Sequence, residues 1–259
     1  MQNQPRIITQ FIHDTLAAAS QIALQYFRQP VSVEVKPDDS PVTIADREIE
    51  QTIRNRITEC FPRHAIYGEE QGQTSGEGGT WVIDPIDGTK SFLLGNPLFG
   101  CLVGFVEDGV VQAGGLAMPV LNEIWFADRN GPTTLNGISC HTSGCRDLST
   151  ASLLTSSPDF FNRDEYRAFE TLSEQIRYRR FGGDCYTYAM LAGGWADLVV
   201  ESALYPFDYL PLVAIVEQAG GVISDWQGNP LGLSSGSQVI AAATPQLHKV
   251  ALNFLNKTN

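Results

Sequence analysis

Residues 81–92 read WVIDPIDGTKSF: an apolar, strand-like run ends in Asp84, and a second aspartate, Asp87, follows three positions later. We expect Pro85 to stop the strand, because proline cannot donate a ladder hydrogen bond. Carboxylates three positions apart across such a turn can converge on one point in space. Hard carboxylate oxygens are the ligands that magnesium prefers. The stretch therefore predicts a cation site at the end of a strand.

Gly88 and Thr89 open the next element of this stretch, which we expect to be a helix. Free amides at a helix N-terminus point outward and can receive an anion such as phosphate. A simpler reading is also open, with Asp84 as a turn residue and Asp87 as a helix N-cap. For an isolated DxxDG motif this simpler reading is the more common one.

Further acidic residues follow other strand-like runs. Glu69 and Glu70 come directly after AIYG (65–68), and Asp208 ends YPF before a predicted helix. Each has a simpler alternative, since Glu70 could be a solvated charge and Asp208 a helix cap. Their joint appearance at strand ends, where sites of α/β proteins gather, favours convergence with the aspartates of residues 81–92.

The first part of the chain has the pattern of helices packed on an antiparallel sheet. Apolar residues at helical spacing predict an amphipathic helix over 5–28, and PDDSP (37–41) breaks the pattern. A second helix is expected from Thr43 to just before Pro62. Asp108-Gly109 is a hairpin signal. The strand-like runs are AIYG (65–68), WVID (81–84), FGCLVGFVED (99–108), VVQAGGLAMP (110–119) and NEIWFAD (122–128).

The second part of the chain alternates strand-like and helical segments, which is typical of an α/β arrangement. We expect two halves, residues 1–144 and 145–259, stacked as one layered sandwich. The expected strands are 152–157, 177–181, 196–201, 222–226 and 239–243, and the expected helices are 163–175, 184–194, 209–221 and a C-terminal one.

Composition excludes several classes of function. The formal net charge is −12 over 259 residues and no basic patch appears, which argues against a nucleic-acid binder. The sequence has no membrane-length apolar run and no signal-peptide pattern, so we expect a cytoplasmic protein. The five cysteines, with His141 between Cys140 and Cys145, do not complete a zinc site, and we expect reduced thiols. An anionic substrate would need local cations to approach so acidic a chain.

Three motifs carry a resemblance to a known family. GEE, WVIDPIDGTKSF, and FD before a helix ending in AGG resemble the inositol monophosphatase-like superfamily of metal-dependent phosphatases. Thr43-Ile44-Ala45-Asp46 is similar to its T-x-A-D segment. The resemblance spans nearly the whole chain and implies an α/β fold, with an α+β N-terminal half and an α/β C-terminal half. The implied architecture is the layered αβαβα sandwich of the inositol monophosphatase and fructose-1,6-bisphosphatase type.

The resemblance also implies a set of metal ligands and a mechanism. Two to three Mg²⁺ per active site would be held by the ligand set Glu69, Asp84, the Ile86 carbonyl, Asp87 and Asp208. A metal-activated water would attack the phosphorus of a small phosphate monoester in line. Glu69 and the Thr89 hydroxyl would orient or deprotonate that water, with Asp46 accepting a hydrogen bond from Thr89. The Gly88 and Thr89 amides would bind phosphate oxygens. For Asp46 and Thr89, first-turn and N-cap roles in helices remain alternatives.

The segment 182–188, GGDCYTY, looks like the histidinol-phosphatase branch of the superfamily. By family position Asp184 and Glu201 would meet the leaving alcohol, and acidic groups suit a cationic alcohol such as L-histidinol. Asp184 as a helix cap is the alternative. Arg180, in the basic run 177–180, is taken as a substrate contact, although a solvent-facing position is also open.

The preferred substrate is therefore L-histidinol phosphate, in histidine biosynthesis. The alternative is inositol 1-phosphate or another small polyol phosphate. A catalytically inactive scaffold and a regulatory module are further alternatives of another class. Since relatives are commonly dimers, the resemblance makes a homodimer possible. The charge and the apolar pattern of the sequence lead us to expect no nucleic-acid or membrane partner.

Overall fold

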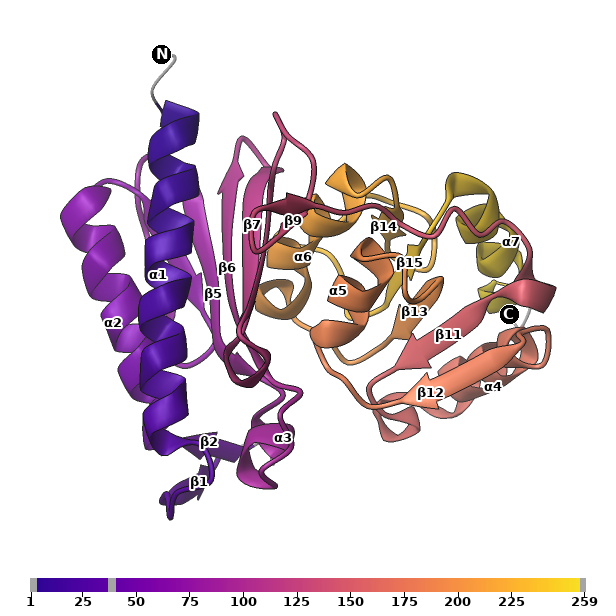
Figure 1. The fold of residues 1–259 in the computed structure, drawn as a ribbon, viewed down its shortest axis with the longest axis horizontal. Helices are drawn as coiled ribbons and strands as arrows, with labels where there is room; N and C mark the ends of the chain where they lie inside the picture. The colour runs from indigo at the N-terminus through magenta and orange to yellow at the C-terminus, as the bar shows by residue number, and fades with distance from the viewer. Residues whose placement is uncertain (1–3, 37–40, 257–259) are drawn as a thin grey trace.

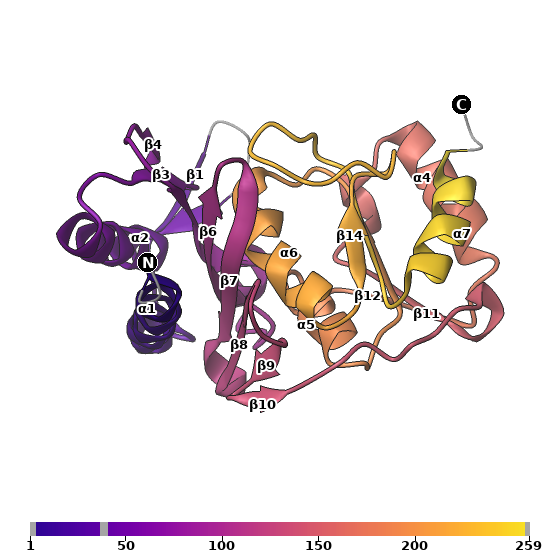
Figure 2. The same cartoon turned by 90° about the horizontal axis from the view of Figure 1, so that it is seen from above.

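The structure is a computed structural model that describes residues 4–36 and 41–256. Its elements form five layers in the order helices, sheet, helices, sheet, helices (Figure 1, Figure 2). This arrangement confirms the predicted αβαβα sandwich. Most of the predicted helix break, PDDSP, lies outside the described residues.

The first layer consists of α1 (Gln4–Tyr26) and α2 (Ile44–Cys60), which cover one face of the first sheet (Figure 2). The apolar residues that predicted these helices, among them Ile12, Leu16 and Ile53, are fully buried against that sheet. Helix α2 begins where the sequence indicated, because the Thr43 side chain caps it.

The first sheet has eight strands in the order β10-β9-β8-β7-β6-β5-β3-β4. All neighbours are antiparallel except β3 and β5, which run parallel. A separate two-stranded hairpin pairs β1 (Val33–Val35) with β2 (Pro41–Thr43). The strands of the large sheet are β3 (Ala65–Gly68), β4 (Gly72–Thr74), β5 (Thr80–Asp87), β6 (Gly100–Glu107), β7 (Val110–Met118), β8 (Glu123–Asp128), β9 (Thr134–Leu135) and β10 (Ile138–Ser139).

The prediction that Pro85 ends its strand is wrong. Strand β5 shifts register between Asp84 and Asp87, and Asp87 pairs again with Gly100 of β6. The irregularity accommodates a residue that lacks an N–H, so that the strand continues past it. Both aspartates are consequently held by the sheet, and helix α3 (Thr89–Leu93) follows directly.

The middle layer contains α5 (Tyr186–Ala192) and α6 (Pro206–Gln218), which lie between the two sheets (Figure 1).

The second sheet has the order β12-β11-β13-β15-β14, and α4 and α7 cover its outer face (Figure 2). Three short 3₁₀ turns also occur within residues 4–36 and 41–256. The remaining bounds are β11 (Ser152–Thr155), β12 (Tyr178–Phe181), β13 (Leu198–Glu201), β14 (Val222–Ser224), β15 (Val239–Ala242), α4 (Arg163–Ser173), α7 (Pro245–Leu255), η1 (Pro119–Leu121), η2 (Leu148–Thr150) and η3 (Pro158–Phe160).

Helix α6 contacts the first sheet closely because β6 and β7 present glycines to it. A Cβ added at Gly114 would lie 1.8 Å from the carbonyl oxygen of Pro211, and one at Gly104 would lie 3.0 Å from the Pro211 Cα. Only a residue without a side chain fits there. The approach matters for function, because α6 carries Asp208 toward the end of β5.

Replacing Gly114 by Ala should destabilise the fold by about 3 kcal/mol, since the added methyl group meets backbone that cannot rotate away. The free energy of unfolding in urea measures this. Gly236→Ala is the matched control, because a Cβ at Gly236 meets nothing within 4 Å. We expect the control to change stability by less than about 0.5 kcal/mol. Equal effects at both positions would contradict the close approach.

The strands of the first sheet end at Ser139, and those of the second begin at Ser152. One apolar core nevertheless continues from strands of the first sheet through α5 and α6 to strands of the second. The division into residues 1–144 and 145–259 therefore remains a prediction about two closely joined halves. None of the helices in the described part of the chain combines the length and apolar character that a bilayer span requires.

Candidate active site

Three carboxylates meet at the junction of the first sheet and the middle helices. Asp84 and Asp87 come from the irregular end of β5, and Asp208 comes from the first turn of α6. One oxygen of each lies within 4.8 Å of the others. Helix α6 starts at Pro206, earlier than predicted, and the Tyr205 amide donates to Asp208 Oδ2 at 2.7 Å. The capping role considered for Asp208 is thus present.

The electrostatics of this group favour a bound cation. Burial and the nearby carboxylates, Glu69 first among them, raise the pKa of Asp84 well above its usual range. Burial raises the pKa of Asp87 to about 7, and burial together with Asp87 raises that of Asp208. Like charges this close disfavour each other's ionisation, and a divalent cation removes that penalty.

Asp84 supplies the most direct evidence that a metal fits. Its side chain is 1% exposed, and its Oδ1 atom has no hydrogen-bond partner among the described residues. A buried carboxylate oxygen without a partner is costly, so such groups are normally hydrogen-bonded or bound to metal. Together with the all-oxygen donor set, this atom fits a hard cation such as Mg²⁺.

Asp87 is held differently from the N-cap that its sequence position allowed. The N-cap of α3 is Gly88, which has a φ of 84°, and no side chain caps the helix. The Asp87 Oδ2 atom instead accepts a hydrogen bond of 2.5 Å from the amide of Cys185, at the start of α5. The carboxylate thus links β5 to the second half of the chain.

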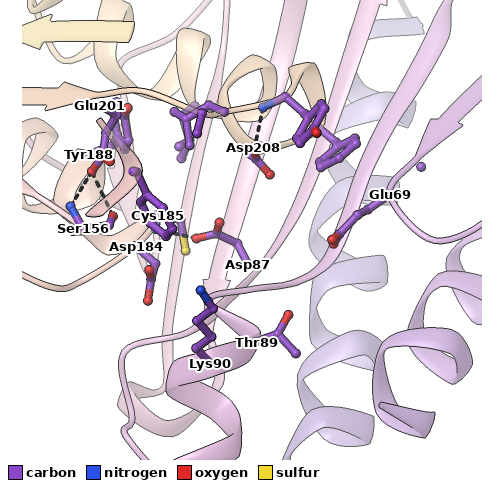
Figure 3. Close-up of a pocket in the computed structure, with 18 of the residues that line it drawn as sticks. Glu69, Asp87, Thr89, Lys90, Ser156, Asp184, Cys185, Tyr188, Glu201 and Asp208 are labelled. Carbon is purple, nitrogen blue, oxygen red and sulfur yellow. Dashed lines mark hydrogen bonds between the residues drawn. The ribbon is translucent and has the colours of Figure 1, made fainter. Parts of the chain in front are cut away.

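Glu69 lies immediately after β3 and points toward the same cavity (Figure 3), but it is not one of the three clustered carboxylates. Its Oε1 atom accepts from Lys36 Nζ at 2.7 Å, and Glu70 Oε1 accepts from the same ammonium at 2.7 Å. Burial, with the repulsion of Glu69, raises the pKa of Glu70 to about 7. Glu70 is therefore a paired residue rather than the freely solvated charge considered from the sequence.

A buried ion pair that the sequence reasoning missed fixes the loop after Glu69. Glu50, fully buried on α2, accepts hydrogen bonds from the amides of Glu70 (2.7 Å) and Gln71 (3.0 Å) and from Arg54 Nε (2.7 Å). A Cβ on Gly68 would lie 2.3 Å from Glu50 Oε1, so this position requires glycine. The detectable signal was a charged pair four residues apart on the otherwise apolar face of a helix.

Thr89 lies at the first position of α3, where its hydroxyl reaches two acceptors. Its Oγ1 atom is 3.0 Å from the carbonyl oxygen of Ile86 and 3.5 Å from Asp46 Oδ1. The other Asp46 oxygen accepts from the Thr43 amide and hydroxyl, at 2.8 and 2.5 Å. Asp46 therefore caps α2, as the simpler reading allowed, and also faces Thr89. Neither the Gly88 nor the Thr89 amide donates a hydrogen bond to another described residue.

Glu69, Asp87, Thr89 and Asp208 line one cavity of about 510 Å³ (Figure 3). Asp184 lies in it at a φ of 45°, and its Oδ2 atom accepts from Ser91 Oγ at 2.8 Å. Asp184 does not cap α5, which begins at Tyr186 with Cys185 as its N-cap residue. Glu201, at the end of β13, is 1% exposed and accepts from the Ser156 amide at 2.7 Å. Both predicted substrate-side acids thus share the cavity.

Arg180 does not line this cavity. It lies exposed on the edge strand β12. This position does not match the predicted substrate contact and agrees with the solvent-facing alternative. The sheet geometry explains the outcome, because all four residues of this edge strand are exposed. Among the described residues, Lys36 and Lys90 line the cavity, and neither of them was predicted from the sequence to have a binding role.

Comparison with known proteins decides the family. A model described as the inositol monophosphatase family matches residues 4–258. The chain belongs to the inositol monophosphatase family.

Two relatives and one solved structure with phosphatase names are similar over most of the chain. The chain is 39% identical over 248 residues to the bifunctional phosphatase IMPL2 of Arabidopsis thaliana, covering 92% of this chain and 72% of that protein. It is 34% identical over 213 residues to a histidinol-phosphatase of Chlorobaculum parvum, covering 81% and 82%. A solved inositol monophosphatase from Zymomonas mobilis superposes with a TM-score of 0.90 at 38% identity, covering 97% and 98%. The chain is thus a phosphatase of the inositol monophosphatase family, which is generally magnesium-dependent.

Proposed function

We propose that the protein is a magnesium-dependent phosphomonoesterase that hydrolyses L-histidinol phosphate to L-histidinol and phosphate. The observation that carries the proposal is the set of acidic side chains that line the cavity of about 510 Å³. Asp87 and Asp208 of the carboxylate cluster line this cavity, and so do two further acids, Asp184 and Glu201. Two acids beside a leaving group suit an alcohol that carries positive charge.

Asp84, Asp87 and Asp208 would hold the metal, with Glu69 and the Ile86 carbonyl as further ligands from the family pattern. When bound, magnesium supplies a Lewis acid that neutralises phosphate charge and lowers the pKa of a coordinated water. For Glu69 to join, its carboxylate would exchange Lys36 for the cation, since the two now lie 2.7 Å apart. This exchange would free the Lys36 ammonium, which also lines the cavity, to face the phosphate.

The residues around α3 would bind the phosphate and take up the proton of the attacking water. The amides of Gly88 and Thr89, which bond to no other described residue, would donate to phosphate oxygens. The Thr89 hydroxyl would accept the water's proton while its own proton passes to Asp46 Oδ1, 3.5 Å away. Burial raises the pKa of Asp46, which favours its acceptance of a proton.

Asp184 and Glu201 would bind the leaving alcohol. Burial raises the pKa of Asp184 and raises that of Glu201 to about 8. Each carboxyl would become fully ionised on meeting a cation, which is the basis of the preference for histidinol. The name of the Chlorobaculum relative agrees with this choice, whereas the Zymomonas relative favours inositol 1-phosphate as the second candidate.

Comparing kcat/KM for histidinol phosphate and inositol 1-phosphate in magnesium tests the substrate. Replacing Asp184 by Asn should lower kcat/KM for histidinol phosphate about 10- to 100-fold, the range for a lost charge-assisted hydrogen bond. The asparagine side-chain oxygen can still accept from Ser91. For uncharged inositol 1-phosphate we expect a change below about threefold.

A ratio of kcat/KM near one for the unmodified protein would remove the histidinol assignment and leave the phosphatase assignment intact. An equal loss on both esters in the Asp184→Asn variant would instead place that residue in the chemistry common to both substrates.

A further inference from the structure

Tyr188 on α5 carries a hydroxyl group that the fold does not use. The residue is 3% exposed and lines the active-site cavity. Its hydroxyl oxygen has no hydrogen-bond partner among the described residues. Buried tyrosine hydroxyls normally find a partner, because desolvating one without compensation is unfavourable. Phenylalanine would fill the same space without that cost, so the hydroxyl needs an explanation outside the folding of this chain.

The hydroxyl lies near the acid at the alcohol end of the cavity. Burial, and next the charge of Glu201, raise the pKa of Tyr188 well above its usual range, so the phenol keeps its proton and can donate it in a hydrogen bond. Figure 3 places Tyr188 beside Glu201 and Ser156, away from Glu69 and Thr89. The group therefore faces the side where the leaving alcohol would lie.

Glu201 is already held by the protein and does not take up this donor. Its Oε1 atom accepts from the amide and hydroxyl of Ser156, at 2.7 and 2.9 Å, and its Oε2 atom is 3.5 Å from Thr155 Oγ1. Tyr188 and Glu201 thus offer a free donor and a partly free acceptor next to each other. A ligand group that contains both an acceptor and a donor matches this pair.

We propose that Tyr188 is a specificity-determining residue, whose hydroxyl donates a hydrogen bond to an acceptor atom on the leaving alcohol of the substrate. The proposal rests on the phosphomonoesterase function above and adds a group that selects polar alcohols over apolar ones. A hydroxyl oxygen and an unprotonated imidazole nitrogen are both suitable acceptors. An ester whose alcohol is purely hydrocarbon would leave the donor unpaired and would bind less well.

The test uses Tyr188→Phe in the full chain with magnesium and three esters: histidinol phosphate, inositol 1-phosphate and propyl phosphate. For whichever polar ester is the better substrate, kcat/KM should fall about five- to tenfold, mainly through a higher KM, as for loss of one neutral hydrogen bond. For propyl phosphate it should change less than about twofold, because that alcohol has no acceptor. The melting temperature should stay equal or rise, since an unpaired buried hydroxyl is removed.

Tyr186→Phe is the matched control on the same helix. The Tyr186 hydroxyl donates to Glu123 at 3.3 Å and does not line the cavity, so the ratio between esters should not change. An equal loss on propyl phosphate, no loss on any ester, or a lower melting temperature of Tyr188→Phe would each overturn the proposal. If inositol 1-phosphate is preferred, only the histidinol assignment fails, because the ratio of polar to propyl ester still tests Tyr188. If the unmodified protein hydrolyses none of the three esters, both proposals fall.

Discussion

Replacing Asp87 by Asn is expected to lower kcat about a thousandfold or more while the chain stays folded. The carboxylate is one of three that approach within 4.8 Å, so it would contribute a full negative charge to the metal. Losing several kcal/mol of metal-based transition-state stabilisation corresponds to at least this factor. The measurement is kcat at saturating magnesium and saturating ester.

The fold should tolerate this substitution for two reasons. An asparagine side-chain oxygen can still accept the hydrogen bond from the Cys185 amide, which Asp87 accepts at 2.5 Å. Burial raises the pKa of Asp87 to about 7, so a neutral side chain is accommodated without metal. We therefore expect the melting temperature in EDTA to be unchanged or higher.

Asp108→Asn is the control for this experiment. Asp108 is exposed in the β6–β7 hairpin at a φ of 51°, a conformation that asparagine adopts readily. The control removes a charge of the same kind and should leave kcat unchanged. Near-normal kcat for Asp87→Asn would contradict the assignment of this residue as a metal ligand.

Magnesium should stabilise the protein against heat, because a cation that binds the folded chain shifts the unfolding equilibrium. At a hundred times the dissociation constant the gain is about 2.7 kcal/mol. For a chain of this size that raises the melting temperature by about 5–10 °C. The probe is Mg²⁺ alone, titrated after EDTA treatment and followed by differential scanning fluorimetry. The repulsion among the buried carboxylates is the reason that the effect should be large.

Two variants make this experiment specific. Asp87→Asn should abolish most of the magnesium-dependent rise, whereas Asp108→Asn should show all of it. A rise of the same size in both variants would show that magnesium acts elsewhere on this acidic chain, and the proposed site would be refuted without any measurement of activity.

Much of the fold was predictable from local pattern. The helices α1 and α2 bury the residues that set their periodicity, and Asp108-Gly109 forms the expected hairpin. The shortest strands were not predicted, because β9 and β10 have only two residues each and carry too little alternation. Pro85 was misread because a register shift, which depends on the neighbouring strand β6, lets the pairing resume.

The candidate site was predictable in its residue types and less so in its contacts. The motif in residues 81–92 indicated Asp84 and Asp87, but their proximity to Asp208 depends on how α6 packs against β6 and β7. The spacing of Glu50 and Arg54 indicates a charged pair on the apolar face of a helix, but its contacts with the loop after Glu69 depend on the tertiary fold. Arg180 drew attention as part of a dense basic run, yet only the sheet topology shows that its strand forms an exposed edge.

Helix α6 has a consequence for how the protein is made. The first sheet is synthesised early, but the inner face that α6 covers, including Gly104 and Gly114, has no cover until residues 206–218 have left the ribosome. Until then, the nascent chain exposes an apolar sheet surface to water, and such exposed surfaces promote misassembly. The same helix brings Asp208, so the proposed metal site is complete only once the sheet is covered. Newly made chains should depend most on chaperones between the synthesis of the first sheet and the emergence of α6 from the ribosome.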